Sequence, residues 1–232
     1  MKTIFLISLL LNIFLFSGCG TNSDSVAPSQ QTSTNILFPS GVCDQIIDKH
    51  YYEVCYSYGK KGALFVGYTL QKDLVDAQNI EERLSFYEEL EIPSAYRSES
   101  DDYTGSGYDR GHMASDASFD YNETALYSVY SMANIVPQNP DVNRYSWIDT
   151  EYLERDKAVE YGSVDVLIAV VYGDNPQRIG ANDIAVPSGF YKKLSNEKVD
   201  YEACYFYENI PYDVELDTLE EHQVDCSYFP FY

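Results

Sequence analysis

The stretch that decides the fold is YTGSGYDRGHMASDASFDYNETALYSVYSMANIVPQNPDVNRYSWIDTE, residues 103–151. It contains an Asp-Arg-Gly-His tetrapeptide at positions 109–112, directly after a Gly-rich turn. His112 is the only one of the chain's three histidines in such a setting. Because an imidazole titrates near neutral pH without perturbation, this side chain is a candidate general base.

A second group of polar residues follows downstream. Asn143 offers an oxygen ligand that a hard divalent cation accepts. If 141–158 is a helix, then Asn143, Trp147 and Glu151 are spaced at i, i+4 and i+8 and line one face. One base, one oxygen ligand and one carboxylate together predict metal-assisted attack by water on a phosphodiester.

These motifs resemble those of the DNA/RNA non-specific endonucleases. The DRGH motif of that family matches residues 109–112 without a change. The family's downstream block, S-N-(I/M)-x-P-Q followed by a spaced Asn and W-x-x-x-E, matches 133–151, except that Ala133 replaces the usual Ser. A weaker resemblance extends over about 60–195. It implies an α+β fold, a central antiparallel β-sheet with helices and a ββα-metal (His-Me) finger, and an endonuclease acting on DNA and RNA.

The resemblance also implies roles for individual residues. His112 deprotonates the attacking water, Asn143 holds one divalent cation, and Glu151 contacts that cation through water. Mg²⁺ is the expected ion, with Mn²⁺ or Ca²⁺ as substitutes, because Mg²⁺ keeps most of its waters and needs few carboxylates. Arg83 stands ten residues before Pro93, where the family has an Arg that reaches the scissile phosphate.

Several of these residues have competing interpretations. Arg97 is an alternative to Arg83 at the phosphate, and a surface salt bridge with neighbouring glutamates is the alternative role for either. Arg110 either contacts phosphate or holds the fold through ion pairs. For Glu151, the alternative to a metal contact through water is a solvent-exposed ion pair with Arg155 at i+4. Other motif residues are expected to support the site through loop hydrogen bonds and packing: Asp109, Asn134, Gln138 and Trp147.

The N-terminus has the features of a processing signal. Residues 1–18 hold an apolar run at 4–16, too short to span a bilayer comfortably, followed by small residues and Cys19. This predicts a lipoprotein-type signal peptide and acylation of Cys19, with a plain secretory signal as the alternative. Residues 19–35 then form a flexible tether, and 36–232 form the nuclease domain. The expected location is the periplasm or surface of a bacterium, through a membrane lipid anchor, or the medium after secretion.

Four cysteines remain after Cys19, and an even number in an exported chain predicts two disulfides. We favour Cys43–Cys55 and Cys204–Cys226 among the three connectivities, because each pair closes a short local loop. Zinc is the competing use of these cysteines, but the sequence has no CxxC and no nearby pair of histidines to support it.

The charge opposes the expected substrate. The chain has 37 acidic and 15 basic residues, a net charge of −22, whereas proteins that hold nucleic acid by its backbone are usually basic. Residues 200–226 alone carry nine carboxylates and no Lys or Arg. A nuclease therefore needs local positive charge and a metal at one cleft. Two other functions stay open: an extracellular phosphodiesterase acting on small diesters, and a non-catalytic surface lipoprotein that binds a partner.

Apolar and β-branched runs predict strands at 51–58, 62–70 and 163–173, and another strand together with a Pro-Gly turn within 182–194. The Gly-Lys-Lys-Gly segment at 59–62 is a turn, so the first two strands form a hairpin. Lys192 and Lys193 are interpreted as ordinary surface charges. The Tyr- and acid-rich tail beyond about 196 is expected to be a packed extension.

Overall fold

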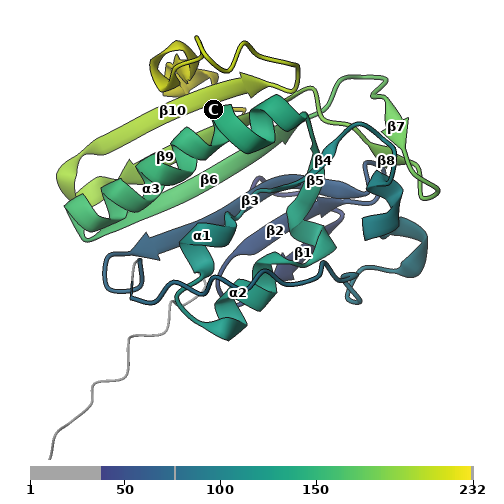
Figure 1. Cartoon of the computed structure of the whole chain (residues 1–232), viewed down its shortest axis with the longest axis horizontal. Helices are drawn as coiled ribbons and strands as arrows, with labels where there is room; N and C mark the ends of the chain where they lie inside the picture. The colour runs from purple at the N-terminus through teal and green to yellow at the C-terminus, as the bar shows by residue number, and fades with distance from the viewer. Residues whose placement is uncertain (1–37, 76, 231–232) are drawn as a thin grey trace, which may run out of the picture.

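The computed structural model describes residues 38–75 and 77–230 of the chain. Its centre is a seven-stranded sheet in the order β1-β2-β3-β6-β9-β10-β11 (Figure 1), in which every neighbouring pair is antiparallel. The strands are β1 (Gln45–Asp48), β2 (Glu53–Ser57), β3 (Gly62–Gln71), β6 (Ser163–Val171), β9 (Gly189–Asn196), β10 (Tyr201–Glu208) and β11 (Gln223–Val224).

The long central strands follow the sequence patterns that predict them. Strand β6, SVDVLIAVV, pairs with β3 on one side and β9 on the other, so its backbone forms hydrogen bonds along both edges inside the sheet. Two features differ from the sequence analysis. Strand β1 precedes the expected hairpin, and residues of the expected tail form β10, which pairs along its whole length with β9.

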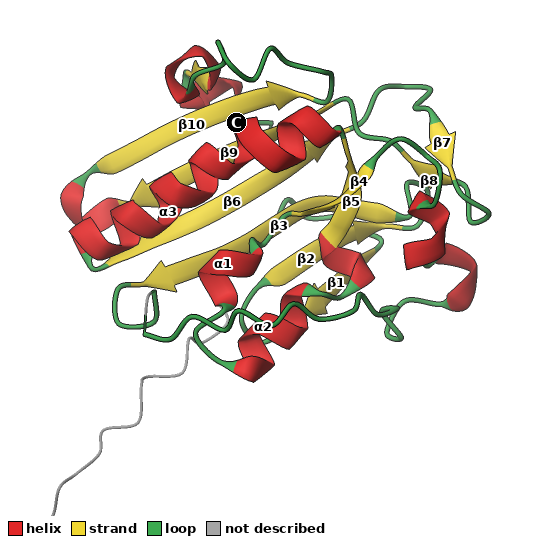
Figure 2. Cartoon of the chain, in the orientation of Figure 1, coloured by secondary structure: helices red, strands yellow, loops and turns green. Residues whose placement is uncertain are grey.

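One face of the sheet is covered by helices, as Figure 2 shows. Helix α3 (Trp147–Tyr161) lies along β6 and β9, and the short helices α1 (Asp116–Phe119) and α2 (Glu123–Val129) lie beside β3 and β2. Trp147 is buried and packs its ring against Phe190 and Tyr207, each with a centroid 5.7 Å away. Trp147 therefore anchors α3 to the sheet, as the sequence analysis expected.

Two further pairs of strands lie outside the large sheet. Strands β4 (Asp109–His112) and β5 (Ile135–Gln138) form an antiparallel pair whose connection contains α1 and α2, and β7 (Arg178–Ile179) pairs with β8 (Ile184–Ala185). After β5, a π-helical turn, Val142–Ser146, leads directly into α3. This order of two strands and one helix is the ββα unit, and the architecture is α+β, as the motifs predicted.

The interpretation of Lys192 and Lys193 as surface charges is wrong. Lys192 lies between Phe190 and Leu194 on β9, and successive side chains of a strand point to opposite faces. All three therefore point toward α3, and the Lys192 ammonium is fully buried and 2.8 Å from the equally buried carboxylate of Glu154. Lys193 faces the other way, is nearly buried, and pairs with Glu202 at 2.5 Å.

Both outer strand pairs of the sheet carry a disulfide. Cys43, just before β1, is bonded to Cys55 in β2. Cys204 in β10 is bonded to Cys226, just after β11. This is the pairing that loop length favoured from the sequence.

The expected signal peptide (1–18), the tether (19–35) and Cys19 lie outside the described residues. Among residues 38–75 and 77–230, the structure has no helix with the length and apolar character needed to span a membrane.

Candidate active site

Strand β4 carries the DRGH motif, and its close packing against β5 explains why position 111 is a glycine. Gly111 lies opposite Val136 on β5, and the Gln138 side chain lies over it. A Cβ atom at Gly111 would lie 2.1 Å from Gln138 Oε1 and 2.6 Å from its Cβ. Only glycine therefore fits between Arg110 and His112 in this pair of strands.

His112 ends β4 with a ring nitrogen free for chemistry. Its Nε2 is buried and has no hydrogen-bond partner in the described part of the chain. The imidazole packs against Phe86 and Tyr130, with ring centroids 5.4 Å and 5.2 Å away. Burial lowers the pKa of His112 to about 4, with Arg83 adding to this effect and Asp116 opposing it. The ring is therefore neutral at pH 7 and can accept a proton.

Asn143 is held in one orientation by Asp109. The Asn143 Nδ2 donates to Asp109 Oδ2 at 3.1 Å, and Arg144 clamps the same carboxylate with two hydrogen bonds of 2.7 and 2.8 Å. Hydrogen bonds from Arg144 keep the pKa of Asp109 below its usual value. Since the amide nitrogen of Asn143 is committed to Asp109, its oxygen points away from that carboxylate and is available to a cation. Asp109 organises this loop, which is the role expected for it.

Glu151 follows Asn143 along the same helix, but the π-helical turn changes its register. Asn143 lies in the wider π segment and Glu151 in regular α-helix, so the i, i+8 spacing does not place them as an ideal α-helix would. Burial raises the pKa of the Glu151 carboxyl to about 7, with Lys192 opposing and Glu154 adding to the effect. Glu151 is partly buried, and the structure contains no ion pair between it and Arg155 within the residues it describes.

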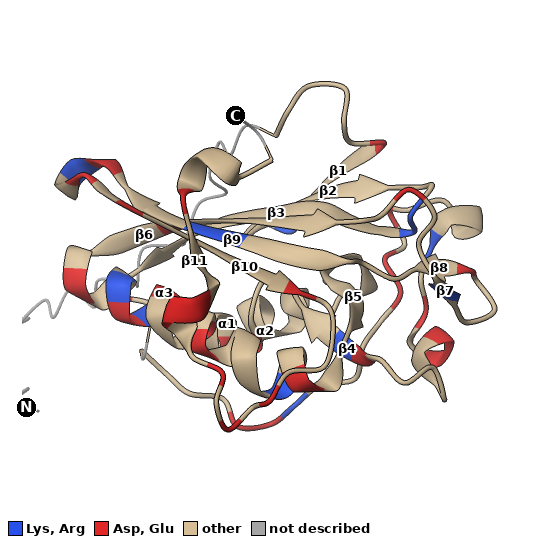
Figure 3. Ribbon diagram, turned by 90° about the horizontal axis from the view of Figure 1, so that it is seen from above, with Lys and Arg blue, Asp and Glu red and all other residues tan. Residues whose placement is uncertain are grey.

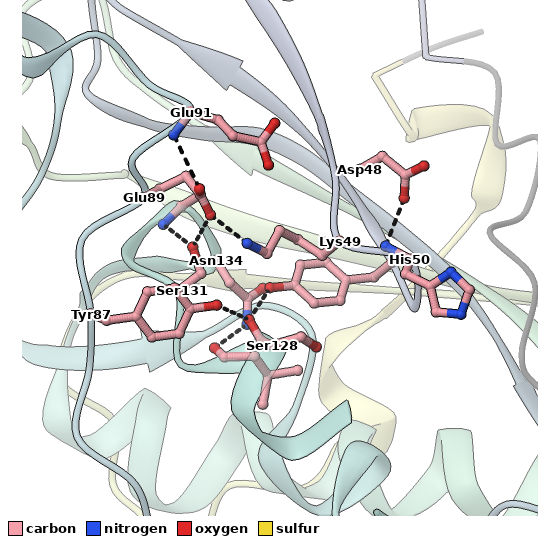
Figure 4. Close-up of polar contacts among 12 residues, drawn as sticks. Asp48, Lys49, His50, Tyr87, Glu89, Glu91, Ser128, Ser131 and Asn134 are labelled. Atoms are coloured by element: carbon pink, nitrogen blue, oxygen red, sulfur yellow. Dashed lines mark hydrogen bonds and ion pairs between the residues drawn. The ribbon is translucent and has the colours of Figure 1, made fainter. Parts of the chain in front are cut away.

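The segment that carries Arg83 is tied to the rest of the fold by its next few residues. The Tyr87 amide donates to the Tyr130 carbonyl at 3.1 Å, and the Met132 amide donates to the Tyr87 carbonyl at 2.9 Å. The Glu89 carboxylate receives hydrogen bonds of 2.7 Å from both Lys49 and Ser131 (Figure 4). This network links the segment both to the end of β1 and to the residues just before β5.

Arg83 is close enough to His112 for its charge to lower the pKa of the imidazole. Its Nε lies 3.2 Å from Asp116 Oδ1, its Nη1 donates to the Ile80 carbonyl, and its side chain is 48% exposed. The Tyr130 hydroxyl donates to the other oxygen of Asp116. Asp116, which the sequence analysis did not single out, therefore connects Arg83 with the aromatic wall of His112. No motif marks it in the sequence.

A second arginine, Arg155, shares a hollow with Arg83. The hollow has a volume of about 390 Å³, and its wall includes Arg83, Asp120, Tyr152 and Arg155. The Nη1 of Arg155 is buried without a hydrogen-bond partner among the described atoms. The sequence analysis considered Arg155 only as a partner of Glu151. Its i+4 spacing from Glu151 was the available signal, but that spacing cannot show an unpaired guanidinium.

The other two candidate arginines are engaged with the backbone. Arg110 donates from Nε and Nη2 to the Ser100 carbonyl at 3.2 and 2.7 Å, and its guanidinium lies over the rings of Phe86 and Tyr103. Of the two roles considered for Arg110, these contacts favour the structural one. Arg97 donates to the carbonyls of Ile92 and Leu90, so its guanidinium holds a loop.

The two remaining motif side chains behave differently. Asn134 is fully buried, donates to the carbonyls of Ala114 and Val129, and accepts from the Ala114 amide, as expected of a loop support. The loop hydrogen bonds expected of Gln138 are not formed: neither its Oε1 nor its Nε2 has a partner in the described residues. The Gln138 side chain instead lies over Gly111 on the opposite strand.

The side chains present suit one hard, mostly hydrated divalent cation. Within the described ranges, no three His, Cys, Asp or Glu side chains gather closely enough to hold a metal ion by themselves. The donor set is instead one oriented amide oxygen, from Asn143, with the Glu151 carboxyl further along the helix. A cation that keeps most of its waters, as Mg²⁺ does, matches so sparse a set.

The chain has a net charge of −22. Figure 3 shows Asp and Glu over the helical layer and the loops, with Lys and Arg between them. Positive charge at the site comes from Arg83 and Arg155, and from Arg144, whose charge is largely offset by Asp109. Carboxylates accompany these arginines, since Asp116 pairs with Arg83, and Asp120 and Asp156 line the same hollow as Arg155.

Comparisons with known proteins agree with this geometry. Residues 29–229 match a family model described as DNA/RNA non-specific endonuclease. The chain is 29% identical over 160 residues to human "Endonuclease G, mitochondrial", covering 65% of this chain and 54% of the relative. It is 29% identical over 174 residues to "Mitochondrial nuclease" of Saccharomyces cerevisiae, covering 69% of this chain and 53% of the relative. The chain thus spans about half the length of these curated relatives.

A solved structure of an EndoG/EndoGI complex has the same fold. It superposes with a TM-score of 0.71 at 23% identity and covers 79% of this chain and 81% of that chain. The names of the relatives also correct one expectation. A bacterial lipoprotein in the periplasm or at the cell surface is contradicted, because the similar proteins from human, budding yeast and fission yeast are mitochondrial nucleases. Short runs of small and apolar residues before a Cys are too weak a signal to have decided the compartment.

Proposed function

The chain belongs to the DNA/RNA non-specific endonuclease family, and we propose that it is a metal-dependent nuclease that hydrolyses phosphodiester bonds in DNA and RNA. The observation that carries this proposal is the free Nε2 of His112, at the end of β4 and beside Arg83. A general base needs a neutral nitrogen with an open lone pair, and the hydrophobic contacts of the ring supply both.

The chemistry follows from the residues around that nitrogen. His112 takes a proton from water as the water oxygen bonds to phosphorus, and the opposite P–O bond breaks and leaves its electron pair on the departing oxygen. Arg83 and Arg155 stabilise the negative charge that builds on the phosphate oxygens. Asn143, oriented by Asp109, would hold a divalent cation that neutralises the phosphate and the leaving oxygen. Glu151 would hold a water of that cation.

The same residues account for the lack of sugar selectivity. Each of the proposed contacts is to a phosphate oxygen or to water, and phosphates are common to DNA and RNA. A site that selects RNA needs a group that recognises the 2′-hydroxyl, which this set of residues does not include.

The test compares two histidine variants of the full chain on supercoiled plasmid and on RNA, with Mg²⁺ and with EDTA. We expect His112→Asn to lose about 100-fold or more of the activity, because general base catalysis contributes on that scale. The matched control, His50→Asn, changes an exposed histidine at positive φ, where Asn is tolerated, and should cut at the wild-type rate.

Asn143→Ala should shift the Mg²⁺ requirement upward or abolish turnover, while Asp109 keeps its two bonds from Arg144. The melting temperatures of all three variants should show that they fold. Wild-type rates in both His112→Asn and Asn143→Ala would refute the proposed site.

A further inference from the structure

Two hollows meet along the exposed side of α3. The hollow that holds Arg83 and Arg155 has a volume of about 390 Å³ and is bordered by Tyr152. A second hollow of about 360 Å³ is bordered by Arg144, Tyr145 and again Tyr152. Tyr152 therefore separates them, and the two hollows together are called the groove here, which contains Arg83 and Arg155 of the candidate site.

The groove exposes two aromatic rings. Tyr145 is 55% exposed and Tyr152 is 58% exposed. They are seven residues apart, or about two helical turns. The guanidinium carbon of Arg155 lies 5.0 Å from the centre of the Tyr152 ring and supports one side of it. Tyr152 thus lies between Tyr145 and the two arginines proposed to act on the phosphate, so both rings are on the same side of Arg83 and Arg155.

The charge in the groove argues against binding through phosphates alone. Asp149 and Asp217 line one hollow, and Asp120 and Asp156 line the other, so carboxylates accompany each arginine. In a chain of net charge −22, release of counterions from a polyanion supplies little affinity. Stacking of a base on an aromatic ring involves no net charge and works with every base, so it meets this need without sequence preference.

We propose that Tyr152 and Tyr145 stack on two nucleotide bases on one side of the scissile phosphate, and that the groove therefore accepts single-stranded DNA or RNA in preference to duplex. This inference rests on the proposed function. The bases of a duplex are stacked on one another and paired, and their faces are not free for a tyrosine. An unpaired strand can turn its bases onto the rings while its phosphates pass Arg83 and Arg155.

The experiment uses the full chain and three forms of one sequence: an unstructured single strand, the same strand in a duplex, and a strand whose bases are missing around the cleavage position. We expect Tyr152→Ala to raise KM for the single strand about tenfold or more, with kcat nearly unchanged. The strand without bases should show no such increase, because its phosphates are intact and only the stacking partner is gone. Tyr152→Phe keeps the ring and should restore the wild-type KM.

Tyr228 provides the control, because it is 71% exposed and lies beyond β11, on no wall of either hollow. Tyr228→Ala should leave KM unchanged. Fluorescence anisotropy of the labelled single strand separates this inference from the proposed function. Binding that depends on Tyr152 without any cutting would overturn the nuclease proposal alone. Cutting whose KM is the same in wild type and Tyr152→Ala, or is raised equally for the strand without bases, would overturn the stacking proposal alone.

Discussion

Replacing Lys192 by Met tests the most deeply buried charge in the fold. Lys192 and Glu154 both have fully buried side chains, and Nζ and Oε2 are 2.8 Å apart. The Glu154 carboxylate also accepts hydrogen bonds from Tyr68 at 3.0 Å and from Ser118 at 2.7 Å. Methionine is close to lysine in volume, so Lys192→Met removes the charge and leaves the carboxylate without its cation.

The expected cost is large. Removing one partner of a buried ion pair costs about 3–5 kcal/mol, because the other charge stays buried and uncompensated. For a domain of this size, each 1 kcal/mol lowers the melting temperature by about 2–4 °C, so the midpoint should fall by about 6–20 °C. The Lys192 ammonium is also 4.5 Å from the centre of the Trp147 ring, and that contact is lost as well.

The free energy of unfolding is measured by urea titration, followed by circular dichroism and by the fluorescence of Trp147, the only tryptophan in the chain. Two further variants sharpen the test. In Lys192→Met with Glu154→Gln, the amide oxygen still accepts from Tyr68 and Ser118, so at least half of the lost stability should return. Lys198→Met changes an exposed lysine just after the same strand and should cost almost nothing.

A loss of less than about 1 kcal/mol in Lys192→Met would refute the assignment of a buried pair, since that is the scale of an ordinary hydrogen bond. The same conclusion would follow if the double variant were less stable than the single one.

The remaining predictions concern the packing of β4 against β5 and the hydrogen bonds of Glu89, which hold the segment that carries Arg83. Gly111→Ala should lower the melting temperature and the cutting rate together, because its Cβ would lie 2.1 Å from Gln138 Oε1; adding Gln138→Gly should restore part of both, and no change in either variant would contradict the packing described. Burial favours a higher pKa for Glu89, but hydrogen bonds from Lys49 and Ser131 outweigh it and leave the pKa below the ordinary value of 4.5. Glu89 should therefore stabilise the fold above about pH 4.5 and lose that contribution as the pH falls through its lower folded-state pKa, so urea titrations across this range should show a flatter pH profile for Glu89→Gln than for wild type. Parallel profiles would show that Glu89 does not contribute in this way.

The parts of the structure that the sequence predicts are those with a local signal. The apolar run of β6 and the hairpin of β2 and β3 are visible in short windows, and the spacing from DRGH to W-x-x-x-E identifies the strand and helix that carry the site. The depth of Lys192 is not visible in such a window. It depends on Glu154, which lies 38 residues away and reaches Lys192 only when α3 is laid across β9.

The limits at the site have the same origin. Asp116 and Arg155 acquire their importance from Arg83, which lies on a different segment: Asp116 pairs with it, and Arg155 shares a hollow with it. The π-helical turn that contains Asn143 also has no clear sequence marker, since Val-Asn-Arg-Tyr-Ser is compatible with an ordinary helix. Gln138 was expected to form loop hydrogen bonds like Asn134, but it lies in β5 over Gly111 and its side-chain atoms have no partner among the described residues.

The two disulfides determine how the molecule carries a mechanical load. A force applied at either end of the chain reaches an outer strand first, and an outer strand held only by hydrogen bonds would peel away one bond at a time. Here the bond between Cys43 and Cys55 passes the force directly to β2, and the bond between Cys226 and Cys204 passes it to β10. On the inner side, β2 pairs with the longer strand β3, and β10 pairs along its whole length with β9, so the hydrogen bonds of each pair are loaded together. While the disulfides are intact, a molecular motor that pulls on a terminus has to break the interior of the sheet; once they are reduced, it can begin at the edge.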